Sequence, residues 1–76
     1  MQNRVHSKHN HYEISMLKEK MKNLPLSHYA ARRATLDYDS FFDRLSKESD
    51  HESLLENPSK AIVRWLQKND LPIILQ

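Results

Sequence analysis

Three histidines near the N-terminus have the spacing H-x-x-H-x-H and are the residues best suited to hold a metal ion. They are His6, His9 and His11. Neutral imidazole nitrogens bind Zn²⁺, Cu²⁺ and Ni²⁺ well. The spacing does not suit a fixed tetrahedral site, no carboxylate lies among the three, and ordering a loose segment costs conformational entropy. We therefore expect no metal site.

Acidic residues in the middle of the chain match some positions of a calcium-binding EF-hand loop. Asp37, Asp39 and Glu48 coincide with positions one, three and twelve of such a loop. Position five is Phe41, which has no oxygen ligand, and position six is Phe42, where the loop needs glycine for its sharp turn. These two replacements exclude a standard EF-hand site.

The other histidines show no catalytic pattern. His28 and His51 have no nucleophile and carboxylate placed near them in the sequence as a catalytic dyad requires. The chain has no cysteine, which excludes thiolate nucleophiles, and no glycine, which excludes standard phosphate-binding loops and nucleophile elbows. We expect a non-enzymatic protein with no catalytic residue, no cofactor and no small-molecule substrate.

The residues that bind a partner must be positioned by helices. The clearest helix signal in the sequence follows Asn57. The Asn57 side chain can accept a hydrogen bond from a free backbone amide, and Pro58 suits a first helical position because its missing N–H is not needed there. Ile62, Trp65 and Leu66 then share one side of the predicted helix. The opposite, polar side carries Lys60, Arg64, Gln67 and Lys68.

Further start signals predict shorter helices upstream. Residues 11–24 have an apolar stripe with helical spacing. Ser27 is expected to cap a second helix and Asp37 a third. Ser49 and Glu52 form the S-x-x-E pattern of a capping box for a fourth. With the helix after Asn57, the chain is predicted to contain several short helices.

These signals predict an all-α fold, a small bundle of four or five short helices with a short extended C-terminal tail. We expect one helical domain over residues 11–76 and a mobile N-terminal tail over residues 1–10, which have no apolar periodicity. A chain of 76 residues buries only a modest core, so a partner or a second copy would add stability. The expected core consists of Leu17, Met21, Tyr29, Leu36, Phe41, Phe42, Leu45, Leu54, Ile62, Trp65 and Leu66.

Charge is unevenly distributed along the chain, although the net charge is only +2. Residues 1–35 carry +5, residues 36–57 carry −5 and residues 58–76 carry +2. The basic first part suits an anionic partner such as nucleic acid, and the acidic block can equally neutralise it within the fold or across a dimer. The residues assigned to nucleic-acid binding in that alternative are Lys18, Lys20, Lys22, Arg32 and Arg33.

The stretch from Ala31 to Phe41 loosely resembles a helix-turn-helix, with Thr35 where the turn usually has glycine. The helix that would enter the DNA groove is expected to expose Asp39, Asp43 and Glu48, which repel phosphates. We therefore do not expect this helix to read DNA.

The C-terminal residues form the one strand-like pattern in the sequence. Pro72 prevents the preceding helix from continuing, and Ile73, Ile74 and Leu75 favour extended backbone. An apolar strand rarely keeps open edges, so the tail either packs on its own chain or pairs with another copy or another protein. The residues assigned to partner binding are Trp65, Leu71, Ile73, Ile74 and Leu75.

The segment LLENPSKAIVRWLQKNDLPIILQ, from Leu54 to Gln76, resembles the helix-then-strand portion of antitoxins of the Phd/YefM type. In that family a short helix ends near an acidic residue and leads through a proline into a strand. Asp70 and Pro72 occupy those places here. The resemblance implies an antitoxin-like regulator that binds a toxin.

The leading functional hypothesis is a small interaction module, an adaptor, inhibitor or regulator, that binds a protein partner or forms a homodimer. The alternatives are a nucleic-acid-associated regulator and an antitoxin-like protein. No apolar run approaches the roughly 20 residues of a membrane span, so we expect no membrane association. The absence of cysteine favours a reducing compartment, and we expect a cytoplasmic location.

Overall fold

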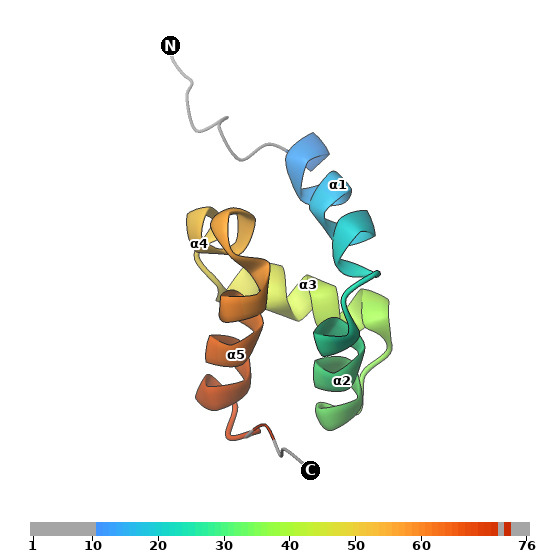
Figure 1. Cartoon of the computed structure of the whole chain (residues 1–76), viewed down its shortest axis with the longest axis vertical. Coiled ribbons are helices and arrows are strands. Elements are labelled where there is room, and N and C mark those ends of the chain that lie inside the picture. The colour runs from blue at the N-terminus through green and yellow to red at the C-terminus, as the bar shows by residue number, and fades with distance from the viewer. Residues whose placement is uncertain (1–10, 72, 74–76) are drawn as a thin grey trace.

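Five α-helices form the part of the chain that the computed structural model describes, residues 11–71 and 73 (Figure 1). No strand occurs among these residues. The all-α prediction of four or five short helices is therefore confirmed. The helices are α1 (His11–Met21), α2 (Pro25–Arg33), α3 (Tyr38–Glu48), α4 (His51–Glu56) and α5 (Pro58–Lys68).

Two of the predicted helix caps are confirmed. The Asp37 carboxylate accepts a hydrogen bond from the backbone N–H of Ser40 at 2.7 Å and starts α3. The Asn57 side chain accepts one from the N–H of Lys60 at 3.2 Å and starts α5, with Pro58 in the first turn. Each cap satisfies a backbone donor that the helix itself leaves unpaired.

Two other predicted caps are wrong. The cap of α4 is Asp50 rather than Ser49, because the Asp50 carboxylate accepts from both the N–H and the hydroxyl of Ser53, each at 3.1 Å. Helix α2 begins at Pro25, so Ser27 lies inside the helix instead of capping it. The fixed backbone angle of proline suits a first helical turn, which places the start upstream of Ser27.

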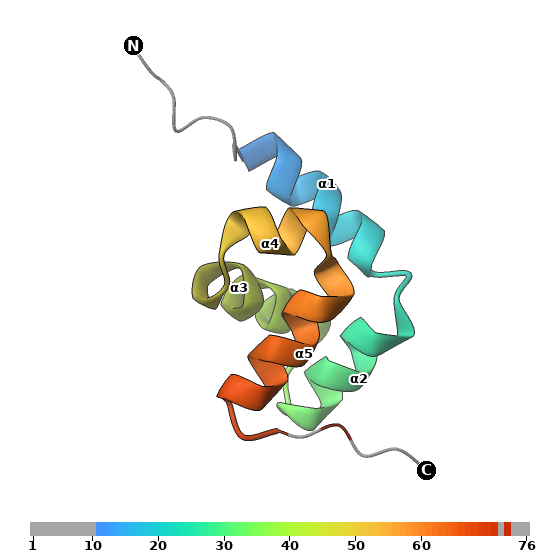
Figure 2. The ribbon, with the colours of Figure 1, turned by 60° about the vertical axis from the view of Figure 1, so that its left-hand side comes forward.

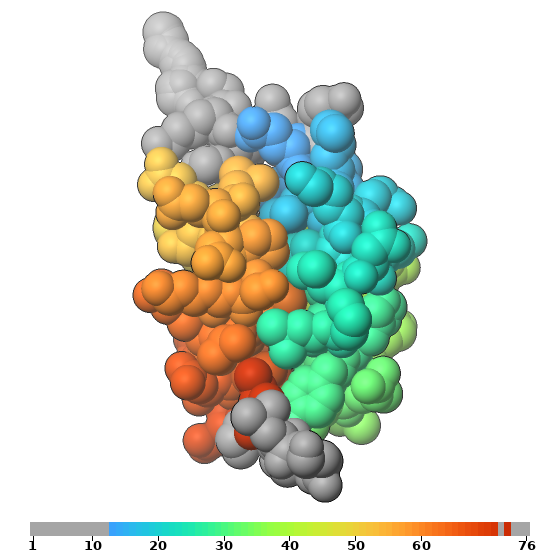
Figure 3. Space-filling view, viewed as in Figure 1, coloured from blue at the N-terminus to red at the C-terminus, as the bar shows by residue number. Residues whose placement is uncertain are grey.

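Helix α5 lies at the centre of the packing and contacts α2, α3 and α4 (Figures 1 and 2). The Trp65 ring meets the Phe41 ring edge-on, with centroids 5.3 Å apart and planes at 81°. In Figure 3, α4 and α5 form one side of the visible face, and α1 and α2 form the other. Every residue predicted for the core is either buried or partly buried and packed against the buried residues. The core also contains Ala30, Ala31 and Ala61.

Tyr38 joins α1 to the other helices. Its hydroxyl donates a hydrogen bond to the backbone carbonyl of Lys18 at 2.6 Å, and its ring lies 6.2 Å from the rings of both Phe41 and Phe42. Burial raises the pKa of Tyr38 to about 12, so the phenol stays protonated as a donor at neutral pH.

The C-terminal ends of helices α2 and α5 have the same type of turn. The N–H of Leu36 donates to the carbonyl of Ala31, and the N–H of Leu71 donates to that of Leu66, each at 2.8 Å. This pairing belongs to Schellman-type ends, which place one residue in the left-handed region and usually use glycine there. The chain has no glycine, and the positions are filled by Thr35, with φ 57°, and Asp70, with φ 60°.

Leu71 and Ile73 are the described residues of the predicted extended tail. Both are partly buried and pack against the core of their own chain, and neither is in a strand. Ile74 and Leu75 lie outside the described residues, as does the predicted N-terminal tail, residues 1–10.

Replacing Thr35 with glycine should stabilise the fold. A β-branched residue in the left-handed region costs roughly 1–2 kcal/mol, and glycine removes this cost at some expense in unfolded-state entropy. We expect Thr35→Gly to raise the free energy of unfolding in urea by about 1 kcal/mol. Asp70→Gly is the matched control and should gain less stability, because aspartate tolerates the left-handed region better than threonine does. Equal or reversed effects would contradict the assignment of strain to Thr35.

Ser27 has a fully buried hydroxyl without a hydrogen-bond partner in the described part of the chain. Such a group costs about 1–3 kcal/mol. Ser27→Ala should therefore raise the unfolding free energy by about 1–2 kcal/mol, measured by urea denaturation. Ser15→Ala, at an exposed position inside α1, corrects for the better helix propensity of alanine, roughly 0.5 kcal/mol. A loss of stability in Ser27→Ala would show that the hydroxyl is satisfied.

Candidate interaction surface

The outer side of α5 carries three basic residues at intervals of four, Lys60, Arg64 and Lys68. Residues at this spacing lie one above another on a helix. All three are exposed, and within residues 11–71 and 73 none of them forms an ion pair with an acidic side chain. The Lys68 ammonium donates to the backbone carbonyl of Glu48 at 3.2 Å. We call these three residues the basic row.

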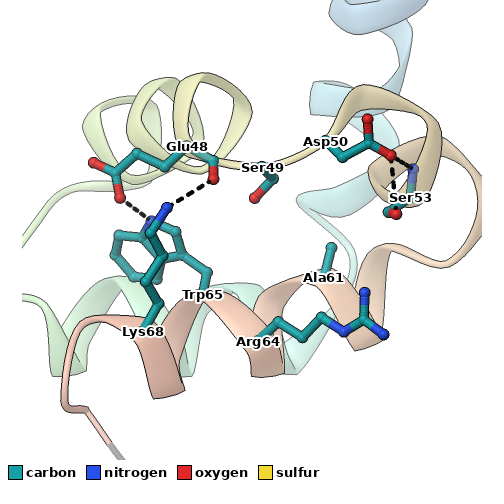
Figure 4. Close-up of a pocket in the computed structure, with 8 residues that line it drawn as sticks. All are labelled: Glu48, Ser49, Asp50, Ser53, Ala61, Arg64, Trp65 and Lys68. Carbon is teal, nitrogen blue, oxygen red and sulfur yellow. Dashed lines mark hydrogen bonds between the residues drawn. The ribbon is translucent and has the colours of Figure 1, made fainter.

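A groove runs between the basic row and α4. It consists of two adjoining hollows of about 150 and 160 Å³, which share Ser53, Ala61 and Arg64 in their walls. Figure 4 shows the first hollow, of about 150 Å³, with the loop of Ser49 and Asp50 on one side and α5 on the other. The second hollow, of about 160 Å³, lies next to it, beside α4 and the start of α5.

The Glu48 carboxylate fixes the position of α5 beside this groove. One of its oxygens accepts from the indole N–H of Trp65 at 2.8 Å, and the other accepts from Nε of Arg44 at 3.1 Å. The Arg44 guanidinium also lies 5.2 Å from the centroid of the Trp65 ring and donates to the Asn69 side chain at 3.0 Å. We call Arg44, Glu48, Trp65 and Asn69 the Glu48 network.

Hydrogen bonds within this network change the acidity of Glu48. The hydrogen bond from Arg44 is the largest cause that holds the pKa of the Glu48 carboxyl below its ordinary value of 4.5; burial opposes it, and the hydrogen bond from Trp65 adds to the lowering. The group is therefore charged at neutral pH, with both oxygens occupied. A carboxylate held in this way fixes the rotation of α5 and the direction in which the basic row points.

The acidic side of the groove is less open to a partner than the basic side. Glu48 is engaged in its network, and the Asp50 carboxylate caps α4 through Ser53. Glu56 is the exposed acid of the second hollow. Lys60 and Arg64 form no ion pair with Glu56 in the described part of the chain, so the α5 wall of the groove presents unpaired positive charge.

The five residues predicted to bind nucleic acid are divided between α1 with its following turn and α2. Lys18 pairs with Asp39 at 3.2 Å, and Lys22 pairs with Glu19 at 3.6 Å. The other three are Lys20 and Arg32, both exposed, and Arg33, which is partly buried. Their nucleic-acid role stays a prediction, but two of the five charges are already neutralised by neighbours.

Those residues predicted to bind a partner that the structure describes are less accessible than the basic row. The Trp65 side chain is only 2% exposed, so its ring presents little surface to a partner in this conformation. Leu71 and Ile73 are partly buried on their own core, and Ile74 and Leu75 lie outside the described residues. The sequence contained the signal for the basic row, because its members stand at i, i+4 and i+8 on the polar side of the predicted helix.

The described histidines bond to the backbone. The Nε2–H of His28 donates to the carbonyl of Lys22 at 2.7 Å, and that of His51 donates to the carbonyl of Ser46 at 3.0 Å. No group of three or more His, Asp or Glu side chains that could hold a metal ion occurs among the described residues. His6 and His9 lie outside them, and only the backbone of His11 is described. In the same part of the chain, no helix combines the length and apolarity needed to cross a membrane.

No protein family, no curated protein and no solved structure matches this chain. The resemblance to Phd/YefM-type antitoxins therefore depends on residues 54–76 alone. Within that segment the helix is present as α5, but Leu71 and Ile73 are not in a strand.

Replacing Glu48 with glutamine tests the network. Because its pKa is lower in the folded than in the unfolded state, the charged form stabilises the fold above the ordinary pKa of 4.5, and this contribution is lost as the pH falls through the lowered value. Glu48→Gln should lower the unfolding free energy by about 1 kcal/mol at neutral pH, and the difference from the wild type should shrink in acid.

Glu56→Gln is the matched control, because Glu56 is exposed and has no hydrogen bond in the described part of the chain. It should change stability by less than about 0.5 kcal/mol. Denaturant unfolding of the three proteins across the acid range is the measurement. Equal losses in the two variants, or a Glu48 effect that does not depend on pH, would show that its charge does not hold α5.

Proposed function

We propose that this protein is a non-enzymatic interaction module that binds an acidic segment of a protein partner through the basic row of α5. The observation that supports the proposal is that Lys60 and Arg64 are exposed and form no ion pair with any described residue, whereas Lys18, Lys22 and Lys47 each pair with an acid. Exposed cations on a fixed helix are ready to meet carboxylates, and such pairs contribute chiefly orientation and a faster encounter. An adaptor, inhibitor or regulator needs no more chemistry than this.

A protein segment suits the row better than nucleic acid does. Glu48, Asp50 and Glu56 line the opposite wall of the groove, where they would repel a wide phosphate backbone. A narrow peptide can place its carboxylates on the α5 side and avoid these acids. The acidic segment can also belong to a second copy, because residues 36–57 carry −5. The absence of cysteine suits action in the cytoplasm.

Reversing the charge of two residues in the basic row should abolish partner binding without unfolding the protein. In Lys60→Glu/Arg64→Glu, attraction to an acidic segment becomes repulsion, and binding should weaken at least about tenfold. Lys20→Glu/Arg32→Glu is the matched control, because it changes two exposed basic residues elsewhere, and both variants shift the net charge from +2 to −2. The measurement is quantitative capture from extracts of the native cell, compared among the three proteins after circular dichroism has shown that each is folded.

The control also separates the alternatives. A protein captured by the wild type and by Lys20→Glu/Arg32→Glu, and lost in the row variant, agrees with the proposal. Duplex DNA or RNA that binds at low salt and is lost only in Lys20→Glu/Arg32→Glu would instead support the nucleic-acid hypothesis. A self-associated mass that depends on the row would identify the partner as a second copy. Capture that is equal for all three proteins would refute a role for the row.

A further inference from the structure

We infer that the first hollow of the groove, the one drawn in Figure 4, binds one medium-sized apolar side chain of the acidic partner segment. This inference depends on the proposed function and adds to it the chemistry of the ligand: an apolar anchor with acidic neighbours. The volume of about 150 Å³ equals that of an engineered protein cavity that binds benzene. A leucine, methionine or phenylalanine side chain has this size.

The wall of the hollow is mostly carbon. Ala61 and Trp65 line the hollow from α5 with little exposed surface of their own, and Arg64 and Lys68, with their aliphatic stems, line it beside them (Figure 4). An apolar side chain that enters here loses contact with water and gains these carbon contacts.

The polar atoms around the hollow are largely occupied. The Glu48 carboxylate accepts from Arg44 and Trp65, and the Asp50 carboxylate accepts twice from Ser53. The Lys68 ammonium donates to the Glu48 carbonyl. A polar ligand would find few free partners, and an anion inside the hollow would meet the two carboxylates. An apolar group is therefore the better occupant.

The basic residues outside the hollow determine which residues of the partner segment should flank its apolar anchor. Arg64 lines both hollows, and Lys60 lines the second. Four residues of helix span about 6 Å, so acids that meet Lys60 and Arg64 must lie within about one helical turn, or two extended residues, of the anchor. The expected ligand is a short segment with one leucine, methionine or phenylalanine close to two or more aspartates or glutamates.

The hollow exists before a ligand binds, because the Glu48 network fixes its α5 side. A site that is already formed loses little conformational entropy on binding. The apolar anchor should then determine the affinity for the partner segment, and the basic row should determine which sequences bind.

Selection from a phage-displayed library of random peptides of about twelve residues tests this inference, since that length spans the row at 1.5 Å per residue. The targets are the full-length wild type, Ser49→Leu, Ser40→Leu and Lys60→Glu/Arg64→Glu. Ser49→Leu places a side chain in the hollow from the exposed loop side, whereas Ser40→Leu makes the same change at an exposed position on α3 that does not line it. Fluorescence anisotropy then measures the affinity of the selected peptides.

The wild type and Ser40→Leu should select acidic peptides with one leucine, methionine or phenylalanine. These peptides should bind at least about tenfold more weakly to Ser49→Leu, and replacing their anchor with alanine should weaken wild-type binding by the same factor. The peptide change keeps the inference testable even if Ser49→Leu fails to fold. Acidic peptides without an apolar preference would overturn the anchor and leave the proposed function intact. Selection without acidic preference, or selection unaffected by reversal of the row, would overturn the proposed function itself.

Discussion

The placement of α5 depends on the carboxylate of Glu48. Hydrophobic burial holds Ile62 and Leu66 in the core, but burial is not directional and leaves the helix free to rotate by small amounts. The hydrogen bond from the Trp65 indole to Glu48 is directional, and Arg44 holds the same carboxylate from the other side. With the indole fixed inward, the basic row must face outward and border the groove.

The fold also decides which charges remain available. The sequence separates basic and acidic blocks, and Lys18 of the first block pairs with Asp39 of the second. The α3 acids Asp43 and Glu48 pair within their own helix, with Lys47 and Arg44. The basic row has no such neighbour in the described structure, although its part of the sequence carries a net charge of only +2. Free positive charge therefore lies on α5 as well as at exposed Lys20 and Arg32 in the part of the chain with the highest positive charge.

Local patterns predicted most of the fold. The spacing of Ile62, Trp65 and Leu66 identified the buried side of α5, and the caps at Asp37 and Asn57 could be read from residue type alone. The predictions based on Ser27 and Ser49 failed because each site had a competing start signal nearby, proline in one case and aspartate in the other. The Glu48 network could not be predicted, because Glu48 and Trp65 are 17 residues apart and only the packing of α3 against α5 brings them together. For the same reason the sequence favours a partner-binding role for Trp65, whereas in the fold its indole N–H donates to Glu48 of the same chain.

We propose that the outer side of α5 is where this protein binds an acidic protein. Site-specific photo-crosslinking in the native cell tests it most directly, with a benzophenone amino acid in place of exposed Gln67 on α5 or of exposed Ser40 on α3. We expect a covalent protein adduct from position 67 and none from position 40, with the attached peptide rich in aspartate and glutamate. Adducts from position 40 alone, or adducts from position 67 that contain only nucleic acid, would contradict it.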